Sequence, residues 1–144
     1  MTMGFLLDTN VLSKVMRENP ATEVMTWLDA QPESLLHTST VTQAEVLASI
    51  AYLPPGQRRD ALASSAEQHF QLDFSGHCLA FGSAAAELYA WVRAQRKMAG
   101  SPISTEDAQI AAIALANQLT LVTRNTKDFQ GIADIQVANP WQPH

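Results

Sequence analysis

The segment Gly4-Phe5-Leu6-Leu7-Asp8-Thr9-Asn10 decides how the rest of the chain is interpreted. A short apolar run followed by residues that favour turns and helix caps predicts a buried strand that ends at Asp8. Because the run should be buried on both faces, Asp8 is expected at the carboxyl end of a central strand, where open α/β sheets place their ligand sites. The alternative role of Asp8 is an N-cap for a helix that begins near Val11.

Further apolar segments alternate with helical patterns along the chain. Strands separated by helices imply parallel pairing, so the sequence predicts an α/β fold, a three-layer α/β/α sandwich with a central parallel sheet of about five strands. We expect one domain over residues 1–144. The later strands are predicted at 35–38, 78–81, 119–123 and 135–137, and the helices at 11–17, 21–30, 42–53, 57–70, 83–98 and 104–118.

Composition limits the class of protein. A chain of 144 residues with 47% hydrophobic residues is the size of one domain with a real core. The single cysteine, Cys78, excludes a disulfide framework or a Cys-rich zinc module and favours a reducing compartment. Neither a leader pattern nor an apolar stretch of about 18 residues is found, so we expect a cytoplasmic protein without a membrane segment.

Two more acids occur at the starts of predicted helices. Glu45 ends the segment Thr42-Gln43-Ala44-Glu45, which has the pattern of a capping box, and Ser104-x-x-Asp107 has the same form. Asp107 also lies on the apolar stripe that continues through Ile110 and Ala114, so its carboxylate should face the sheet and needs a partner there. Taken singly, each acid is more typical of a structural role than of a catalytic one.

The loop 123–128 leaves the fourth predicted strand, again at a carboxyl end, so all these acids exit the same sheet edge. Neighbouring ionised carboxylates require cations, and sites with oxygen ligands alone select Mg²⁺ or Mn²⁺ rather than zinc. Magnesium held by carboxylates supports phosphodiester hydrolysis. Motifs for a serine or cysteine nucleophile or a phosphate-binding glycine loop do not occur. The histidines form no ligand spacing and are interpreted as incidental: His37, His69, His77 and His144.

The formal net charge of -5 speaks at first against a nucleic-acid substrate, because affinity for phosphates normally comes from clustered Lys and Arg. Most of the nine basic residues, however, lie close in sequence to the acidic segments. This distribution makes four of them candidates for contacts with RNA: Arg93, Arg96, Lys97 and Arg124. The alternative is that they belong to ordinary solvated faces.

With these residues in place, the sequence resembles the PIN-domain family, and within it the VapC-like toxins of bacterial toxin–antitoxin systems. The resemblance covers nearly the whole chain and implies a parallel sheet of about five strands, Mg²⁺-dependent cleavage of RNA, dimerisation, and a cognate antitoxin that occludes the site. It rests on 5–11, 42–45, 107–114 and 121–125, in this order and spacing, with Asn139-Pro140-Trp141 near the end.

By match to the family motifs, Asp8, Glu45 and Asp107 carry over as the catalytic and metal-binding acids, and Thr123 as a hydroxyl that orients them. The family often has a fourth acid at the position held here by Asn125, which brings no charge, and whether Asp128 takes its place stays open.

Three other readings compete with the nuclease. A phosphatase with an aspartyl nucleophile would have a second Asp where Asn10 stands, and a receiver-like domain would need a lysine after a late strand and leaves Glu45 without a role. The third is a non-catalytic PIN scaffold that binds only RNA or a partner, against which the three retained acids argue.

Overall fold

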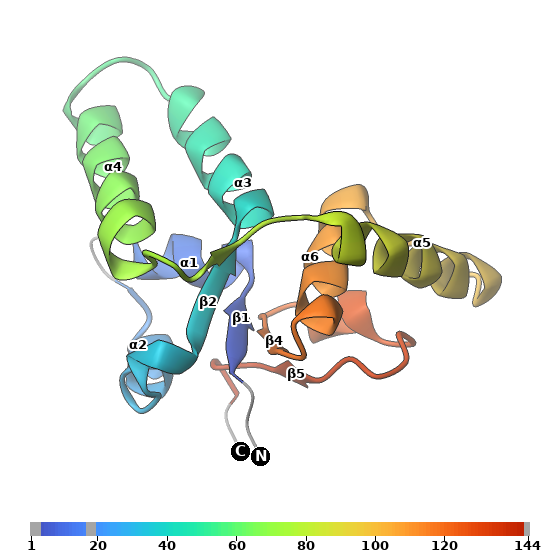
Figure 1. The fold of residues 1–144 in the computed structure, drawn as a ribbon. Helices are drawn as coiled ribbons and strands as arrows, with labels where there is room; N and C mark the ends of the chain where they lie inside the picture. The colour runs from blue at the N-terminus through green and yellow to red at the C-terminus, as the bar shows by residue number, and fades with distance from the viewer. Residues whose placement is uncertain (1–3, 17–19, 143–144) are drawn as a thin grey trace.

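The computed structural model describes residues 4–16 and 20–142, and Figure 1 shows their fold. Five short strands form one sheet in the order β3-β2-β1-β4-β5, and every neighbouring pair is parallel. This sheet confirms the predicted fold class. The strands are β1 (Phe5–Leu7), β2 (Leu36–Ser39), β3 (Cys78–Leu79), β4 (Thr120–Val122) and β5 (Val137–Ala138).

The helices lie close to the predicted segments; the helix predicted at 83–98 has the predicted ends, and the other helices differ at one end or both. The first helix ends at Val15, and residue 17 of the predicted helix lies outside the described residues. The last turn of the predicted helix 57–70 is wider than an α-helix and forms a π-helical segment, η2 (Gln68–Asp73). The helices are α1 (Thr9–Val15), α2 (Thr22–Asp29), α3 (Thr40–Ala51), α4 (Gln57–Glu67), α5 (Ser83–Met98) and α6 (Thr105–Ala116), with short 3₁₀ turns η1 (Glu33–Leu35) and η3 (Thr126–Phe129).

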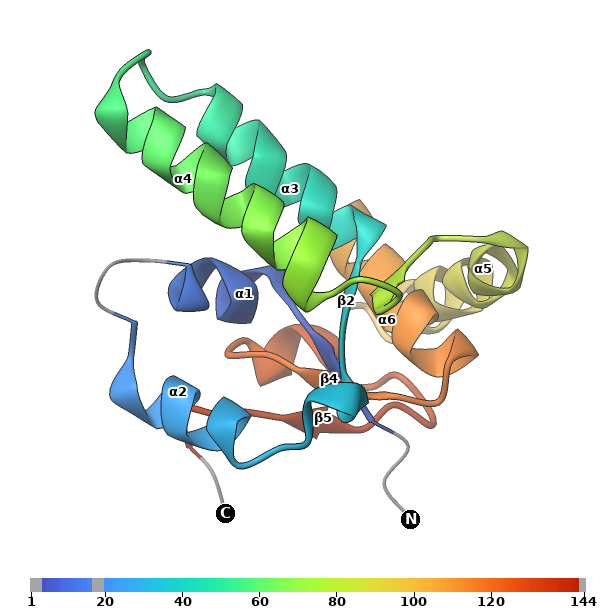
Figure 2. The same ribbon diagram turned by 60° about the vertical axis from the view of Figure 1, so that its left-hand side comes forward.

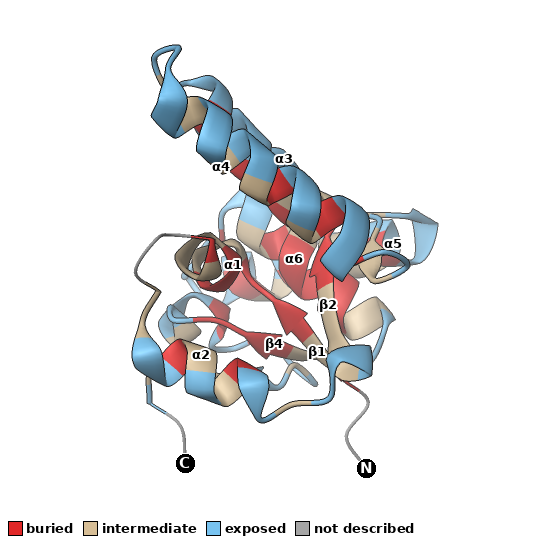
Figure 3. Ribbon diagram, turned by 90° about the vertical axis from the view of Figure 1, so that its left-hand side faces the viewer, coloured by how far each residue is buried: buried red, intermediate tan, exposed pale blue. Residues whose placement is uncertain are grey.

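The helices cover both faces of the sheet because side chains alternate along the strands. Leu6 and Leu121 pack into the cluster formed by α5 and α6, whereas Leu7 and Val122 pack into the cluster formed by α1, α2, α3 and α4. Figure 1 shows the two groups of helices on opposite sides of β1, and Figure 2 shows α3 and α4 as a hairpin that extends beyond the sheet. The buried residues concentrate on β1, β4 and α6 (Figure 3).

The strand order places a topological switch point at the centre of the sheet. From β1 the chain proceeds outward to β2 and β3, and it then returns to the other side of β1 for β4 and β5. The carboxyl ends of β1 and β4 are therefore neighbours, and the Asp8 amide donates to the Val122 carbonyl over 2.9 Å. Crevices at such switch points are where open α/β sheets bind ligands. No helix among the described residues has the length and apolar character needed to cross a membrane.

Candidate active site at the carboxyl ends of the central strands

Asp8 lies at the centre of the site, where β1 passes directly into α1. Its side chain is 5% exposed. One carboxylate oxygen, Oδ1, accepts from the Thr9 amide over 2.8 Å, and Oδ2 accepts from the Thr123 hydroxyl over the same distance. Asp8 is the N-cap of α1 and at the same time a buried acid at the carboxyl end of β1, so the predicted cap and the predicted position occur together.

Thr123 is the matching residue at the end of β4, and it is fully buried. Its amide donates to the Ala138 carbonyl of β5 over 2.9 Å, and this hydrogen bond fixes the backbone of Thr123. Its hydroxyl donates to Asp8 and accepts from the Asn125 amide over 3.1 Å. Because the hydroxyl hydrogen is directed at the carboxylate, Thr123 orients Asp8.

Glu45 is joined to Asp8 through Thr9. The Thr9 hydroxyl donates to Oε1 of Glu45 over 2.7 Å and lies 3.1 Å from the Thr42 hydroxyl. The predicted capping box of Thr42 and Glu45 is wrong, because β2 runs into α3 without a loop and the helix already begins at Thr40. Ser39 is the N-cap, and its side chain accepts from the Thr42 amide. Glu45 is therefore one turn inside the helix and faces α1.

Asp107 stands in the first turn of α6, which the predicted cap, Ser104, begins. The Ser104 hydroxyl accepts from the Asp107 amide over 3.2 Å. Burial raises the pKa of the Asp107 carboxyl, the Ser104 hydroxyl lowers it, and the charges of Asp128 and Glu45 raise it further. Asp107 therefore lies within the electric field of three other acids, because the charge of the neighbouring Glu106 also raises its pKa.

The electrostatics of the site favour a bound cation. Burial raises the pKa of Asp8 to about 6, although the hydrogen bonds from Thr123 and Thr9 act in the opposite direction. The charges of Asp107 and Glu45 add smaller contributions that also raise it. Acids at the start of α1, in α3 and in α6 thus repel one another across one small region, and a positive ion would relieve this repulsion.

The donor atoms fit a hydrated hard cation rather than a closed cage. Among the described residues, no three His, Cys, Asp or Glu side chains converge closely enough to surround an ion by themselves. Mg²⁺ does not need such a cage, because it keeps several waters and binds directly to one or two carboxylates. Asp8 and Asp107 supply oxygen ligands of the kind that Mg²⁺ and Mn²⁺ prefer.

Comparison with known proteins decides the family. The model of the PIN domain matches residues 5–135, which include every strand except β5 and all the acids described above. The chain belongs to the PIN-domain family. This match confirms the resemblance found in the sequence.

Three relatives match this chain over nearly its whole length. The plasmid stability protein StbB of Pseudomonas syringae pv. tomato is 43% identical, over 95% of this chain and 98% of the relative. The VapC ribonuclease Y4jK of Sinorhizobium fredii is 36% identical, over 96% and 98%. Toxin FitB of Neisseria gonorrhoeae is 38% identical, over 94% and 97%.

Solved structures with the same fold are similar over the whole chain. FitAcB from Neisseria gonorrhoeae has a TM-score of 0.85 and 35% identity, and the match covers 96% of this chain and 99% of that one. A toxin-antitoxin complex from Klebsiella pneumoniae has a TM-score of 0.69 and 27% identity, covering 96% and 99%.

The loop after β4 carries the remaining candidates of the PIN domain. Asn125 is exposed and directly precedes η3, whereas Asp128 lies within η3. The charge of Asp128 raises the pKa of Asp107 more than the charge of Glu45 does. Of the two positions discussed for a fourth acid, Asp128 therefore contributes negative charge to the site, and Asn125 contributes a neutral side chain at its entrance.

Arg96 is not available to RNA, contrary to the sequence-based expectation. It is 6% exposed, and its Nε donates to the Ser101 carbonyl over 2.7 Å while Nη1 donates to the Asp128 carbonyl. The reason is the periodicity of α5, because Val92 and Arg96 continue one buried face of the helix. Arg96 instead ties the end of α5 to the loop that carries Asp128.

The other basic candidates remain on the surface. Arg93 is exposed, but its Nη1 donates to the Ile103 carbonyl over 2.8 Å, next to the cap of α6. Lys97 is exposed as well. Arg124 is exposed at the edge of the acidic site, with its guanidinium carbon 4.9 Å from the centre of the Trp141 ring. The basic side chains thus divide between structural and accessible positions.

The three histidines within the described residues lie apart from the acidic site. The rings of His37 and His77 stack at 4.7 Å beside β2 and β3, and His69 lies 3.0 Å from Asp73 in η2. His144 lies outside the described residues. The residue that sequence reasoning missed is Thr9, which joins Asp8 to Glu45. The available signal was its position directly after the acid at a strand end.

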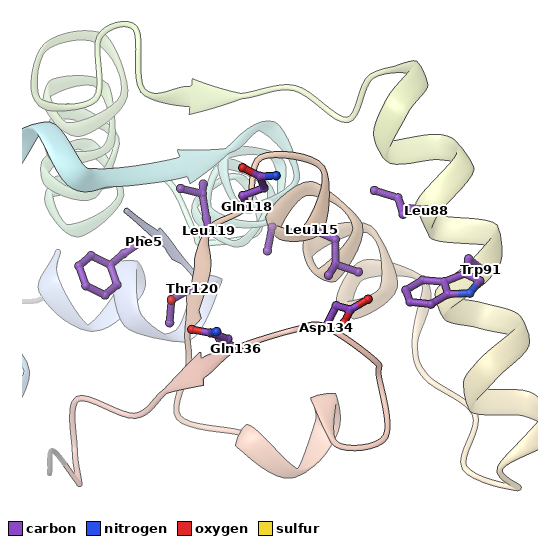
Figure 4. Close-up of a pocket in the computed structure, with 10 residues that line it drawn as sticks. Phe5, Leu88, Trp91, Leu115, Gln118, Leu119, Thr120, Asp134 and Gln136 are labelled. Carbon is purple, nitrogen blue, oxygen red and sulfur yellow. The ribbon is translucent and has the colours of Figure 1, made fainter. Parts of the chain in front are cut away.

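A cavity of the PIN domain lies at the amino-terminal ends of the central strands, away from the acidic site. It has a volume of about 970 Å³ and opens beside the first residues of β1 and β4, Phe5 and Thr120. Figure 4 shows Trp91, Leu115 and Gln118 around it. It shares no residue with the acidic site, so its size does not make it the place of the chemistry.

Proposed function

We propose that this PIN domain is a metal-dependent endoribonuclease and the toxin of a toxin–antitoxin pair. The observation that carries the proposal is the arrangement of Asp8, which is buried at the switch point, oriented by Thr123 and joined through Thr9 to Glu45, with Asp107 nearby. The names of relatives support the activity, because one at 36% identity is a VapC ribonuclease and another at 38% is Toxin FitB.

Asp8 and Asp107 would hold the ion, which we propose to be Mg²⁺ with Mn²⁺ as a substitute. When bound, such an ion makes water more acidic and neutralises charge on the leaving oxygen of a phosphodiester. The chain's own residues orient the carboxylate and accept the proton. Thr123 and the Thr9 amide fix the direction of the Asp8 carboxylate, and Glu45, held at Oε1 by the Thr9 hydroxyl, accepts the proton of the attacking water.

The proposal is tested by two substitutions that remove charge and preserve shape. Asp8→Asn and Asp107→Asn should each lower Mg²⁺-dependent cleavage of single-stranded RNA at least about 100-fold, since positioned metal charge is worth several kcal/mol in the transition state. Asp60→Asn, an exposed acid of α4, is the matched control and should cleave as fast as the wild type.

The outcomes separate the alternatives. If either active-site variant retains wild-type cleavage, the assigned metal site is wrong. If the wild type binds RNA but never cleaves it with Mg²⁺ or Mn²⁺, the chain is the non-catalytic PIN scaffold. A phosphatase would instead release phosphate from small esters and leave RNA intact.

The pairing with an antitoxin is part of the proposal, as are a homodimer and action in the cytoplasm, where cellular RNA is found. The solved toxin-antitoxin complex with 27% identity supports the pairing. An antitoxin that places a cationic side chain among Asp8, Glu45 and Asp107 would compete with the metal for the same negative potential. The purified complex should then cleave RNA more slowly than the free protein. Equal rates would contradict occlusion, and light scattering of the free protein tests the dimer.

A further inference from the structure

A polar pocket of about 730 Å³ adjoins the acidic site, and its lining includes Asn125 and Asp128 of that site. It lies between the loop that follows β4 and the segment that follows β5, and its lining includes Arg124, Lys127, Asn139 and Trp141. The two sites share a wall, because Asn125 lines the pocket while its amide donates to the Thr123 hydroxyl, which holds Asp8. A ligand in the pocket would therefore lie directly beside the reacting groups.

The lining of the pocket includes an aromatic ring and a guanidinium group that contact each other. The guanidinium carbon of Arg124 lies 4.9 Å from the centre of the half-buried Trp141 ring. Asn139 joins the two segments, since its Oδ1 accepts from the Trp141 amide over 2.9 Å and its Nδ2 donates to the Arg124 carbonyl. The Arg124 amide donates in turn to Asn10 of α1. The aromatic and cationic groups are thus held together before a ligand arrives.

The positions of the basic side chains near the acids also favour this pocket as the RNA contact. Arg96 is buried, and Arg93 donates to a backbone carbonyl, so the end of α5 is a poor path for a phosphate chain. Arg124 and Lys127 line the pocket and are exposed. The pocket therefore offers two accessible cations beside the acids, and its lining also includes the acids Glu23 and Asp128.

We propose that this pocket binds a nucleobase of single-stranded RNA next to the phosphate that is cut, a proposal that rests on the proposed function. The base stacks against the pair formed by Trp141 and Arg124, and Lys127 faces the backbone. Stacking on aromatic rings and guanidinium planes requires a base that is free of a duplex, as in loops and single strands. The polar rim, which includes Glu23, Asn139 and Gln142, offers donors and acceptors that can distinguish bases.

The test measures binding without cleavage. A fluorescent ten-nucleotide RNA of mixed sequence and an abasic oligomer of the same length are bound to the protein in EDTA and followed by anisotropy. Trp141→Ala should weaken binding of the RNA about 5- to 150-fold, because stacking contributes about 1–3 kcal/mol per base. Binding of the abasic oligomer should not change. Trp91→Ala, which removes an exposed tryptophan at the other cavity, should change neither.

A second variant separates stacking from folding. Arg124→Lys keeps the charge of an exposed side chain and removes its planar face, so it should weaken RNA binding and preserve the salt dependence. Thermal unfolding checks each variant. If Trp141→Ala and Arg124→Lys both bind RNA as tightly as the wild type, or lose equal affinity for the abasic oligomer, the subsite is wrong.

Failure of the proposed function gives a different result. A wild type that binds RNA through Trp141 but never cleaves it would contradict the nuclease and retain the RNA site. If the pocket variants lose affinity for the antitoxin but bind RNA as tightly as the wild type, the pocket is a protein-binding site. That result would overturn the proposed nucleobase subsite.

Discussion

The buried carboxylate of Asp8 makes the metal-free protein less stable at neutral pH. Its pKa rises from 3.8 to about 6 on folding, so between these values the folded protein keeps a proton that the unfolded chain has released. The free energy of unfolding therefore falls as the pH rises through this window, and above pH 6 the loss reaches about 3 kcal/mol, since one pKa unit corresponds to about 1.4 kcal/mol. Below pH 4 the loss is absent.

Asp8→Asn removes the charge and keeps the shape, so it should recover most of this loss. The amide can accept at one oxygen only, and a lost hydrogen bond costs about 1 kcal/mol. In EDTA at pH 7.5 the variant should thus be about 2 kcal/mol more stable than the wild type. At pH 4 it should be equal or slightly less stable.

Urea denaturation between pH 4 and 8 measures this difference, with Asp60→Asn as the control that should shift stability by less than about 0.5 kcal/mol at every pH. Adding Mg²⁺ should stabilise the wild type more than Asp8→Asn, because an ion that binds only the folded state shifts the equilibrium toward it. A variant that is less stable than the wild type at pH 7.5, or a difference that does not vary with pH, would show that Asp8 is not a desolvated acid.

Three further substitutions test single contacts. Thr9→Val removes the hydroxyl that holds Glu45, so single-turnover cleavage should slow about 10-fold while RNA affinity stays unchanged. An unaltered rate would show that the contact is dispensable. Arg96→Met leaves two backbone carbonyls without their donor, so urea denaturation should show a free energy of unfolding lower by about 2–4 kcal/mol. Lys97→Met is the control and should lower it by less than about 0.5 kcal/mol. Similar losses in the two variants would contradict the buried role of Arg96. Asn125→Asp should tighten Mn²⁺ binding to the RNA-free protein in calorimetric titration, and equal affinity would show that this side chain does not face the metal.

The order of strands and helices could be predicted because each carries its own pattern. A buried apolar run of Phe5–Leu7 and the stripe of α6 are visible in the sequence, and they place Asp8 and Asp107 at element ends. The beginning of α3 could not be predicted from pattern alone. Both Ser39 and Thr42 are good caps, and which of them caps the helix depends on where pairing of β2 with β3 stops, since Ser39 is the last residue of β2 and pairs with Leu79. The contact of Thr9 with Glu45 depends on that start, because moving the helix would turn Glu45 away.

Arg96 shows why closeness in sequence to the acids is a poor guide to RNA contacts. Along α5, Ala85, Val92 and Arg96 are all buried, so the stripe that covers α6 ends on an arginine. A cation in that position is satisfied by carbonyl groups of the loops that it joins, one of them at Asp128. Neutralising the basic group of α5 would therefore weaken RNA binding by disturbing the loop beside Asp107 even if α5 never touches RNA. The informative charges are those whose removal leaves the fold intact, and near the acids these are Arg124 and Lys127, both exposed at the mouth of the polar pocket.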